Sequence, residues 1–261
     1  MNHGIPRNWR FVTGTGALDF VLGNNGDETP HGVVQSSITV LRGAAQAGKS
    51  TLLTQVAYDL AGACEDPCRV LLASPMGRGS AGRAILARIA QAEALPPSDL
   101  LTMADLPSVS TVMLAARALD ADVVIIDDVD LMPDARLPGV VDMLHALRSE
   151  GVTVLAACHC SAPPLLARAA DVILDLSFDG EAPDARILRG IKNAHAPLAE
   201  AKMRMGDGGL TSVVCPLRVR ASEQGGGGDD DGGPGEDEGG SGGAPVVHGR
   251  SRKVPGAGKP N

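Results

Sequence analysis

Residues 43–50 read Gly-Ala-Ala-Gln-Ala-Gly-Lys-Ser, a complete match to the pattern G-x-x-x-x-G-K-[ST]. The stretch before them, residues 37–41, is short and apolar, and the stretch after them has the spacing of a helix. Between a strand and a helix, the glycines let the backbone curl so that successive N–H groups face inward. These groups and the positive end of the helix dipole bind phosphate. The sequence therefore predicts a phosphate-binding loop (P-loop).

Such a loop predicts a nucleoside triphosphate as ligand, and we expect ATP with Mg²⁺. The ammonium group of Lys49 should reach the β and γ oxygens, and the Ser50 hydroxyl should coordinate the metal. The expected nucleotide-binding residues are the loop and the start of the helix: Gly43, Ala44, Ala45, Gln46, Ala47, Gly48, Lys49, Ser50 and Thr51.

From residue 36 onward, short apolar runs alternate with helical periodicity, which is typical of a parallel sheet covered on both faces. The fold class predicted is α/β, with a mostly parallel central sheet. Strands are expected at 37–41, 69–73, 100–103, 123–126, 153–157, 172–176, 186–191 and 202–205, followed by a turn at 206–209. Helices are expected at 49–62, around 84–92, at 109–119 and at 140–149.

Three polar residues follow two of the predicted strands. Asp127 comes directly after the apolar run 123–126 and, together with the P-loop upstream, is predicted to hold Mg²⁺ through water. Asp128 has two interpretations, a base for the attacking water or a cap of the next turn. His159 follows the strand 153–157, at the edge where ligands bind in such sheets. It either senses the γ-phosphate or is an ordinary surface histidine.

Composition divides the 261 residues into three parts. Residues 1–35 hold three of the five aromatic residues and are expected to pack on the core, residues 36–220 form the α/β domain, and the Gly-rich and acidic stretch 221–261 is predicted to be disordered. The net charge of −8 becomes −5 without that stretch. This excludes a generally basic surface for gripping nucleic acid, so DNA contact requires a local patch or an assembly. The acidic run 229–238 is either a solvated linker or a nucleic-acid mimic.

Neither a membrane span nor a signal peptide is visible in the sequence, because no apolar run reaches the ~18 residues that a span needs. A cytoplasmic location is therefore expected. The five cysteines form an odd set, for which free thiols are the default. A zinc site of Cys64, Cys68, Cys158 and Cys160 is disfavoured, because Cys68 precedes a predicted strand and the last two follow one.

Three stretches resemble the RecA-type ATPases. They are residues 13–19 (Thr-Gly-Thr-Gly-Ala-Leu-Asp), residues 48–57 from the second P-loop glycine onward, and residues 188–193 (Leu-Arg-Gly-Ile-Lys-Asn), with Pro197 and Glu200 beyond. The resemblance is closest to the ATPase core of the RadA/Sms DNA-repair proteins and covers about residues 10–214. It implies an ATPase in DNA recombination, repair or replication that acts on single-stranded DNA as a ring or filament.

By the same resemblance, Lys192 reaches across a subunit boundary to the neighbour's γ-phosphate, with Arg189 as a second candidate for this role. Contact with a DNA backbone would come from loop arginines, such as Arg78 and Arg83, or Arg136.

The chain also departs from the family pattern. The zinc module and the Lon-protease-like domain of RadA proteins have no counterpart in these 261 residues, and the signature after Asn193 continues as Ala-His, not as Arg-Phe-Gly. RecA-type enzymes place a glutamate after their second strand, where this chain has Ser-Pro-Met-Gly at 74–77. Slow hydrolysis is therefore expected unless Asp128 acts as the base. The alternative function is a nucleotide-binding regulatory or scaffold protein of the RecA superfamily, with little catalysis and no DNA.

Overall fold

A computed structural model describes residues 10–23, 31–63, 67–75, 79–132, 138–159, 164–180 and 182–213. The stretch 221–261, which the sequence predicts to be disordered, lies outside the described residues. None of the helices within the ranges above is long and apolar enough to cross a membrane.

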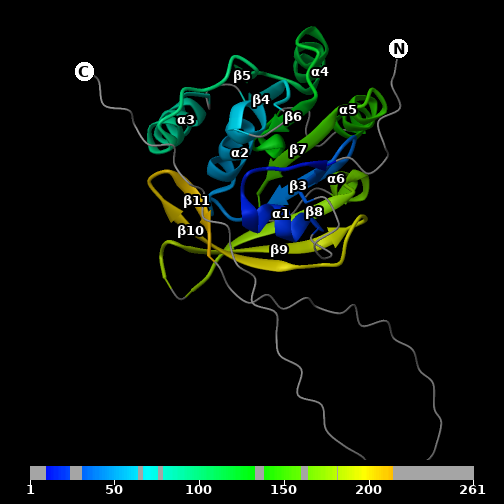
Figure 1. Cartoon of the computed structure of the whole chain (residues 1–261). Coiled ribbons are helices and arrows are strands. Elements are labelled where there is room, and N and C mark those ends of the chain that lie inside the picture. The colour runs from blue at the N-terminus through cyan, green and yellow to red at the C-terminus, as the bar shows by residue number, and fades with distance from the viewer. Residues whose placement is uncertain are drawn as a thin grey trace, which may run out of the picture. The chain divides into compact units, whose positions relative to one another are not determined.

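The described chain is organised around a nine-stranded sheet with the order β11-β10-β9-β8-β3-β7-β6-β4-β5 (Figure 1). Six neighbouring strands are parallel: β3 (Ile38–Arg42), β4 (Val70–Ser74), β5 (Leu101–Asp105), β6 (Val123–Ile126), β7 (Thr153–Cys158) and β8 (Val172–Phe178). The remaining three continue the sheet in antiparallel fashion: β9 (Ala185–Asn193), β10 (Glu200–Gly206) and β11 (Gly209–Ser212). The predicted α/β class with a mostly parallel sheet is confirmed.

Helices cover both faces of the parallel strands, because successive side chains of a strand point to opposite faces. Leu72 and Ile125 pack on the face of α2 (Lys49–Tyr58), which continues as a π-helical turn (Asp59–Ala63) and lies beside α3 (Gly79–Glu93). Leu71 and Val124 pack on the other face. That face is covered by α4 (Val109–Ala118), α5 (Pro138–Ser149) and α6 (Pro164–Ala169).

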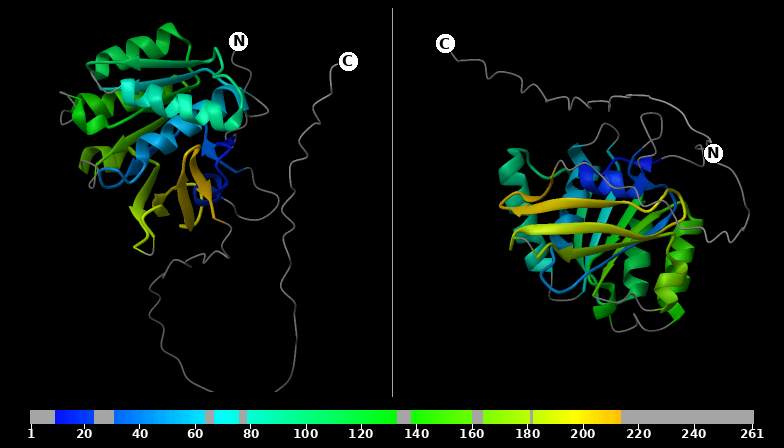
Figure 2. Two further views of the ribbon diagram at one scale, coloured as in Figure 1. Left: turned by 90° about the vertical axis from the view of Figure 1, so that its left-hand side faces the viewer. Right: turned by 90° about the horizontal axis from the view of Figure 1, so that it is seen from below.

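The N-terminal residues contribute elements that the sequence pattern did not predict. They form α1 (Gly16–Gly23) and a small sheet of β1 (Arg10–Phe11) and β2 (Val33–Val34). Figure 2 shows α1 lying against the antiparallel strands, where it packs on β9 and β10. Its buried side chains, Leu18, Val21 and Leu22 among them, share one hydrophobic cluster with α2.

Asp19 ties the start of this segment together. Its Oδ1 accepts a hydrogen bond from the backbone N–H of Thr13, which is completely buried, at 2.9 Å. Burial raises the pKa of Asp19 from 3.8 to about 6, although the hydrogen bonds from Thr13 and the charge of His31 act in the opposite direction. This hydrogen bond therefore joins the first and last residues of the stretch 13–19.

This raised pKa predicts a pH-dependent stability. Folded Asp19 binds its proton more tightly than the unfolded chain does, so its contribution to the unfolding free energy falls by about 3 kcal/mol as pH rises from about 4 to 6. Asp19→Asn keeps an oxygen acceptor for Thr13 and removes the titration. Urea unfolding across this pH range should therefore give a flatter profile for Asp19→Asn. Asp99→Asn, at an exposed position, should keep the wild-type slope; identical slopes for all three proteins would contradict the assignment.

Candidate functional site

The loop 43–50 leads from β3 into α2 at the carboxyl edge of the parallel strands, and both of its glycines are required, Gly43 by space and Gly48 by its backbone conformation. A Cβ on Gly43 would lie 2.3 Å from the carbonyl oxygen of Leu176 in β8. Gly48 has φ +105°, and a Cβ there would lie 2.5 Å from Cε of Met205. Because only glycine fits at these two positions, the loop takes the curled path that the motif predicts.

Lys49, the first residue of α2, directs its ammonium group back over the loop. Its Nζ donates hydrogen bonds to the carbonyl oxygens of Gly43 at 3.0 Å and Ala44 at 3.2 Å, and lies 3.4 Å from Nδ1 of His159. The lysine is 5% exposed. A buried cation held by two backbone carbonyls is positioned to exchange those partners for phosphate oxygens.

The two residues predicted to hold the metal are in direct contact. Ser50 Oγ, in the first turn of α2, donates a hydrogen bond to Asp127 Oδ1 at 3.1 Å. Asp127 directly follows β6, and its backbone N–H is held by the carbonyl of Ala73 in β4 at 2.9 Å. A hydroxyl and a carboxylate oxygen side by side are the hard oxygen ligands that Mg²⁺ prefers, so this pair fits the metal.

Asp128 is 4% exposed and has φ 51°, a left-handed conformation that aspartate tolerates. It precedes the 3₁₀ turn Val129–Leu131, but its side chain makes no capping hydrogen bond to that turn. The backbone carbonyl of Asp128 binds the N–H of Leu131 instead. The capping interpretation of the carboxylate is therefore not supported, and its role as a base stays a prediction.

The carboxyl end of β4 carries Ser74 and Pro75, as the sequence shows, and Ser74 is buried. Its carbonyl accepts the N–H of Leu106 at 2.9 Å. Residues 76 and 77 lie outside the described part. In the described residues at this strand end there is thus no carboxylate where RecA-type enzymes are expected to have one.

His159 is held at the carboxyl end of β7 by a residue that the sequence did not single out. Its backbone N–H donates to Asp130 Oδ2 at 3.1 Å, whereas the buried Oδ1 of Asp130 has no hydrogen-bond partner among the described residues. Asp130 is the third aspartate among the four residues after β6. This cluster of acidic residues is the sequence signal that could have identified it.

The neighbouring cysteine, Cys158, is completely buried. Burial, assisted by the negative charge of Asp130, raises the pKa of the Cys158 thiol to about 12. Cys158 ends β7, whereas Cys68 precedes β4 at the opposite end of the parallel strands. Cys64 and Cys160 lie outside the described residues.

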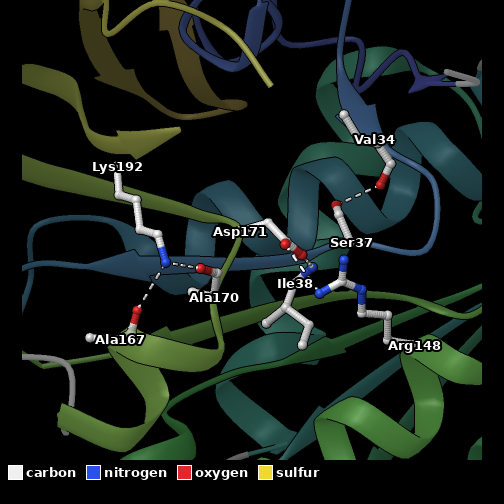
Figure 3. Close-up of polar contacts among 8 residues, drawn as sticks. All are labelled: Val34, Ser37, Ile38, Arg148, Ala167, Ala170, Asp171 and Lys192. Carbon is white, nitrogen blue, oxygen red and sulfur yellow. Dashed lines mark hydrogen bonds and ion pairs between the residues drawn. The ribbon is translucent and has the colours of Figure 1, made fainter. Parts of the chain in front are cut away.

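Lys192 lies at the edge of the sheet opposite the P-loop. It pairs with Ile173 near the start of β8, and its Nζ donates to the backbone carbonyls of Ala170 and Ala167 (Figure 3). Arg189 forms an ion pair with Glu200, with 2.7 Å between Nε and Oε2. Lys192 therefore lies away from the phosphate site of its own chain, and the Arg189 side chain is engaged by Glu200. A role of either residue toward a neighbouring subunit stays a prediction.

Asp171, directly before β8, stabilises the same edge of the sheet, the one opposite the P-loop. Its Oδ2 accepts the backbone N–H of Ile38 at 2.9 Å, and Arg148 lies 3.1 Å from Oδ1 (Figure 3). These contacts join the first residue of β3 and the residue before β8 to α5. The strand that carries the P-loop is thereby fixed at its far end.

Comparisons with known proteins give the fold. The chain superposes on a KaiC-like protein from Pyrococcus horikoshii with a TM-score of 0.60 and 16% identity, over 79% of this chain and 99% of that one. It superposes on a RadB recombinase with a TM-score of 0.60 and 18% identity, over 78% and 99% of the two chains. The chain has a RecA-like fold.

The sequence of this RecA-like core is similar to that of RadA. It is 28% identical to the DNA repair protein RadA of Mycobacterium tuberculosis over 226 residues, which cover 79% of this chain and 44% of that protein. It is 29% identical to RadA of Pseudomonas aeruginosa over 227 residues, which cover 80% and 47%. The chain thus spans less than half the length of these curated relatives. No protein-family model matches it.

Proposed function

We propose that this chain binds ATP with Mg²⁺ at the loop 43–50 and works as a RecA-like ATPase in DNA recombination, repair or replication. The observation that carries the proposal is the convergence of Lys49, Ser50 and Asp127 on one loop at the carboxyl edge of the sheet. The similarity to RadA supports the cellular process.

Each residue has a role that follows from its position. The backbone N–H groups of the loop and of Thr51 surround the phosphates, and Lys49 moves from its carbonyl partners to phosphate oxygens. Ser50 and Asp127 would hold Mg²⁺, and the ion would supply positive charge next to the phosphates. The proposed role of His159 is to sense the γ-phosphate, which its distance of 3.4 Å between Nδ1 and Lys49 Nζ supports.

Hydrolysis is proposed to be slow. The described end of β4 offers Ser74 and Pro75, neither of which accepts a proton from water at neutral pH. Asp128, the residue after Asp127, is the carboxylate proposed to orient the attacking water. Its burial and left-handed backbone hold it at the same end of β6 as the metal ligand.

A second candidate function is a nucleotide-gated switch without DNA, which the non-acidic end of β4 favours. ATP turnover measured with and without single-stranded DNA distinguishes the two. Stimulation by DNA supports the ATPase that acts on DNA, whereas tight binding with no turnover in either condition supports the switch. Absence of ATP binding would contradict both.

Assembly is the remaining part of the proposal. A role for Lys192 at a γ-phosphate requires a second copy of the chain, because this lysine lies at the amino edge of its own sheet. We therefore propose a ring or filament in which one copy's Lys192 faces the next copy's P-loop.

A further inference from the structure

Arg186 reaches the P-loop from a distant part of the chain. It is the second residue of β9, and its Nε donates a hydrogen bond to the carbonyl oxygen of Ala47 at 2.9 Å. The two residues are 139 positions apart. Arg186 is only 6% exposed, which is unusual for an arginine and requires that its donors have partners.

The guanidinium group is oriented by the β8–β9 hairpin. Its Nη1 donates to the carbonyl oxygens of Pro183 at 2.7 Å and Ala185 at 2.9 Å. Its carbon lies 4.3 Å from the centre of the Phe178 ring, within the range of a cation–π contact. Three hydrogen bonds and a ring contact leave this planar group little freedom, so the position of Nε is set by the hairpin.

Other contacts hold the same side of the loop. The carbonyl of Leu176 lies against Gly43, and the Met205 side chain lies against Gly48. In β11, the N–H of Leu210 donates to Oε1 of Gln55 in α2 at 3.0 Å. The antiparallel part of the sheet thus packs against the loop and the helix that follows it.

We infer that Arg186 is a positioning residue for the P-loop. A trans peptide directs its C=O and its N–H to opposite sides. By holding the Ala47 carbonyl, Arg186 therefore fixes the direction of the Gly48 N–H, a donor in the middle of the loop. The loop is preorganised before nucleotide arrives, which lowers the cost of binding. This inference rests on the proposed binding of ATP.

Arg186→Met tests it. Methionine keeps much of the apolar contact with Phe178 but loses all three hydrogen bonds. In equilibrium titrations with Mg²⁺ and a non-hydrolysable ATP analogue, we expect Kd to rise at least tenfold, which corresponds to ~1.4 kcal/mol. Hydrogen exchange without nucleotide should be faster at the loop amides, a local change that a general loss of stability would not confine there.

Arg204→Met is the matched control. Arg204 lies on β10 opposite Ala185 and is exposed. Its replacement by methionine removes the same charge near the hairpin but leaves the Arg186 contact with the loop in place. It should keep the wild-type Kd. Equal Kd values for Arg186→Met and the wild type, or equal losses in both variants, would overturn the inference.

Two milder variants cover the case in which Arg186→Met does not fold. Arg186→Lys keeps the charge with one donor group in place of the fork, and Phe178→Leu removes the ring beneath the guanidinium. Both should raise Kd above the wild-type value, and an unchanged Kd in both would overturn the inference. Failure of the wild type to bind the analogue would instead contradict the proposed function itself.

Discussion

Lys49→Ala is expected to weaken ATP binding at least 100-fold while the fold stays intact. The variant removes the ammonium group that lies against the carbonyls of Gly43 and Ala44, and a charge-assisted hydrogen bond is worth about 1.5–3 kcal/mol. Two such bonds to phosphate exceed the ~2.7 kcal/mol that a 100-fold change in Kd requires. The hydrogen bonds of the Lys49 ammonium group go to carbonyls of the loop and not to the core, so the thermal midpoint should change little. Calorimetric titration and thermal unfolding measure the two quantities on one preparation.

Arg88→Ala serves as the control for a lost positive charge, because Arg88 is exposed on α3. It should bind ATP as the wild type does. If Lys49→Ala keeps wild-type affinity, the P-loop assignment is wrong. If its affinity and thermal midpoint fall together, the variant has lost its fold and Lys49→Arg, which keeps the charge, becomes the informative protein.

The second large effect separates the two adjacent aspartates. Asp128→Asn should lower the already slow release of phosphate by about 10²–10⁴-fold with little change in ATP affinity, because positioned general bases contribute on that scale. Asp127→Asn should weaken Mg²⁺-dependent ATP binding as well, because its oxygen lies 3.1 Å from Ser50 Oγ. Phosphate release and nucleotide affinity, each measured over a series of Mg²⁺ concentrations, distinguish the two variants.

A third carboxylate provides the control for this pair. Asp105 ends β5, two strands away from β6 in the sheet, and lies 3.7 Å from Arg83. Asp105→Asn should leave turnover unchanged. Brisk phosphate release by Asp128→Asn would show that the base lies elsewhere. If phosphate release fell in Asp105→Asn alone, Asp105 at the end of β5 would be the candidate base.

The parts of the fold that sequence predicts are those with a strong local signal. The uninterrupted run Val123–Ile126 was predicted as a buried strand and is one. The P-loop motif predicts the strand–loop–helix geometry. It also predicts that Ser50 and Asp127 lie together, because the carboxyl ends of parallel strands meet at one edge of the sheet. Predicted strand boundaries differ from the observed ones by one or two residues at most ends.

Elements that depend on tertiary packing were not predictable in this way. Helix α1 has only eight residues, and it is buried on more than one side, because Ala17 and Asp19 are buried in addition to the face of Leu18, Val21 and Leu22. Arg186 and Asp130 form hydrogen bonds with backbone atoms of Ala47 and His159. Every residue has such backbone atoms, so the residue types at 47 and 159 do not indicate these contacts. The sequence spacing between such partners carries no information until the sheet order is known.

The most direct test of the central claim is a crystal structure with Mg²⁺ and a non-hydrolysable ATP analogue. The account predicts the β and γ phosphates inside the loop 43–50, Lys49 Nζ moved from the carbonyls of Gly43 and Ala44 to phosphate oxygens, and the metal between Ser50 and Asp127. Density for the analogue at any other place on the molecule, with Lys49 still bound to those carbonyls, would contradict it.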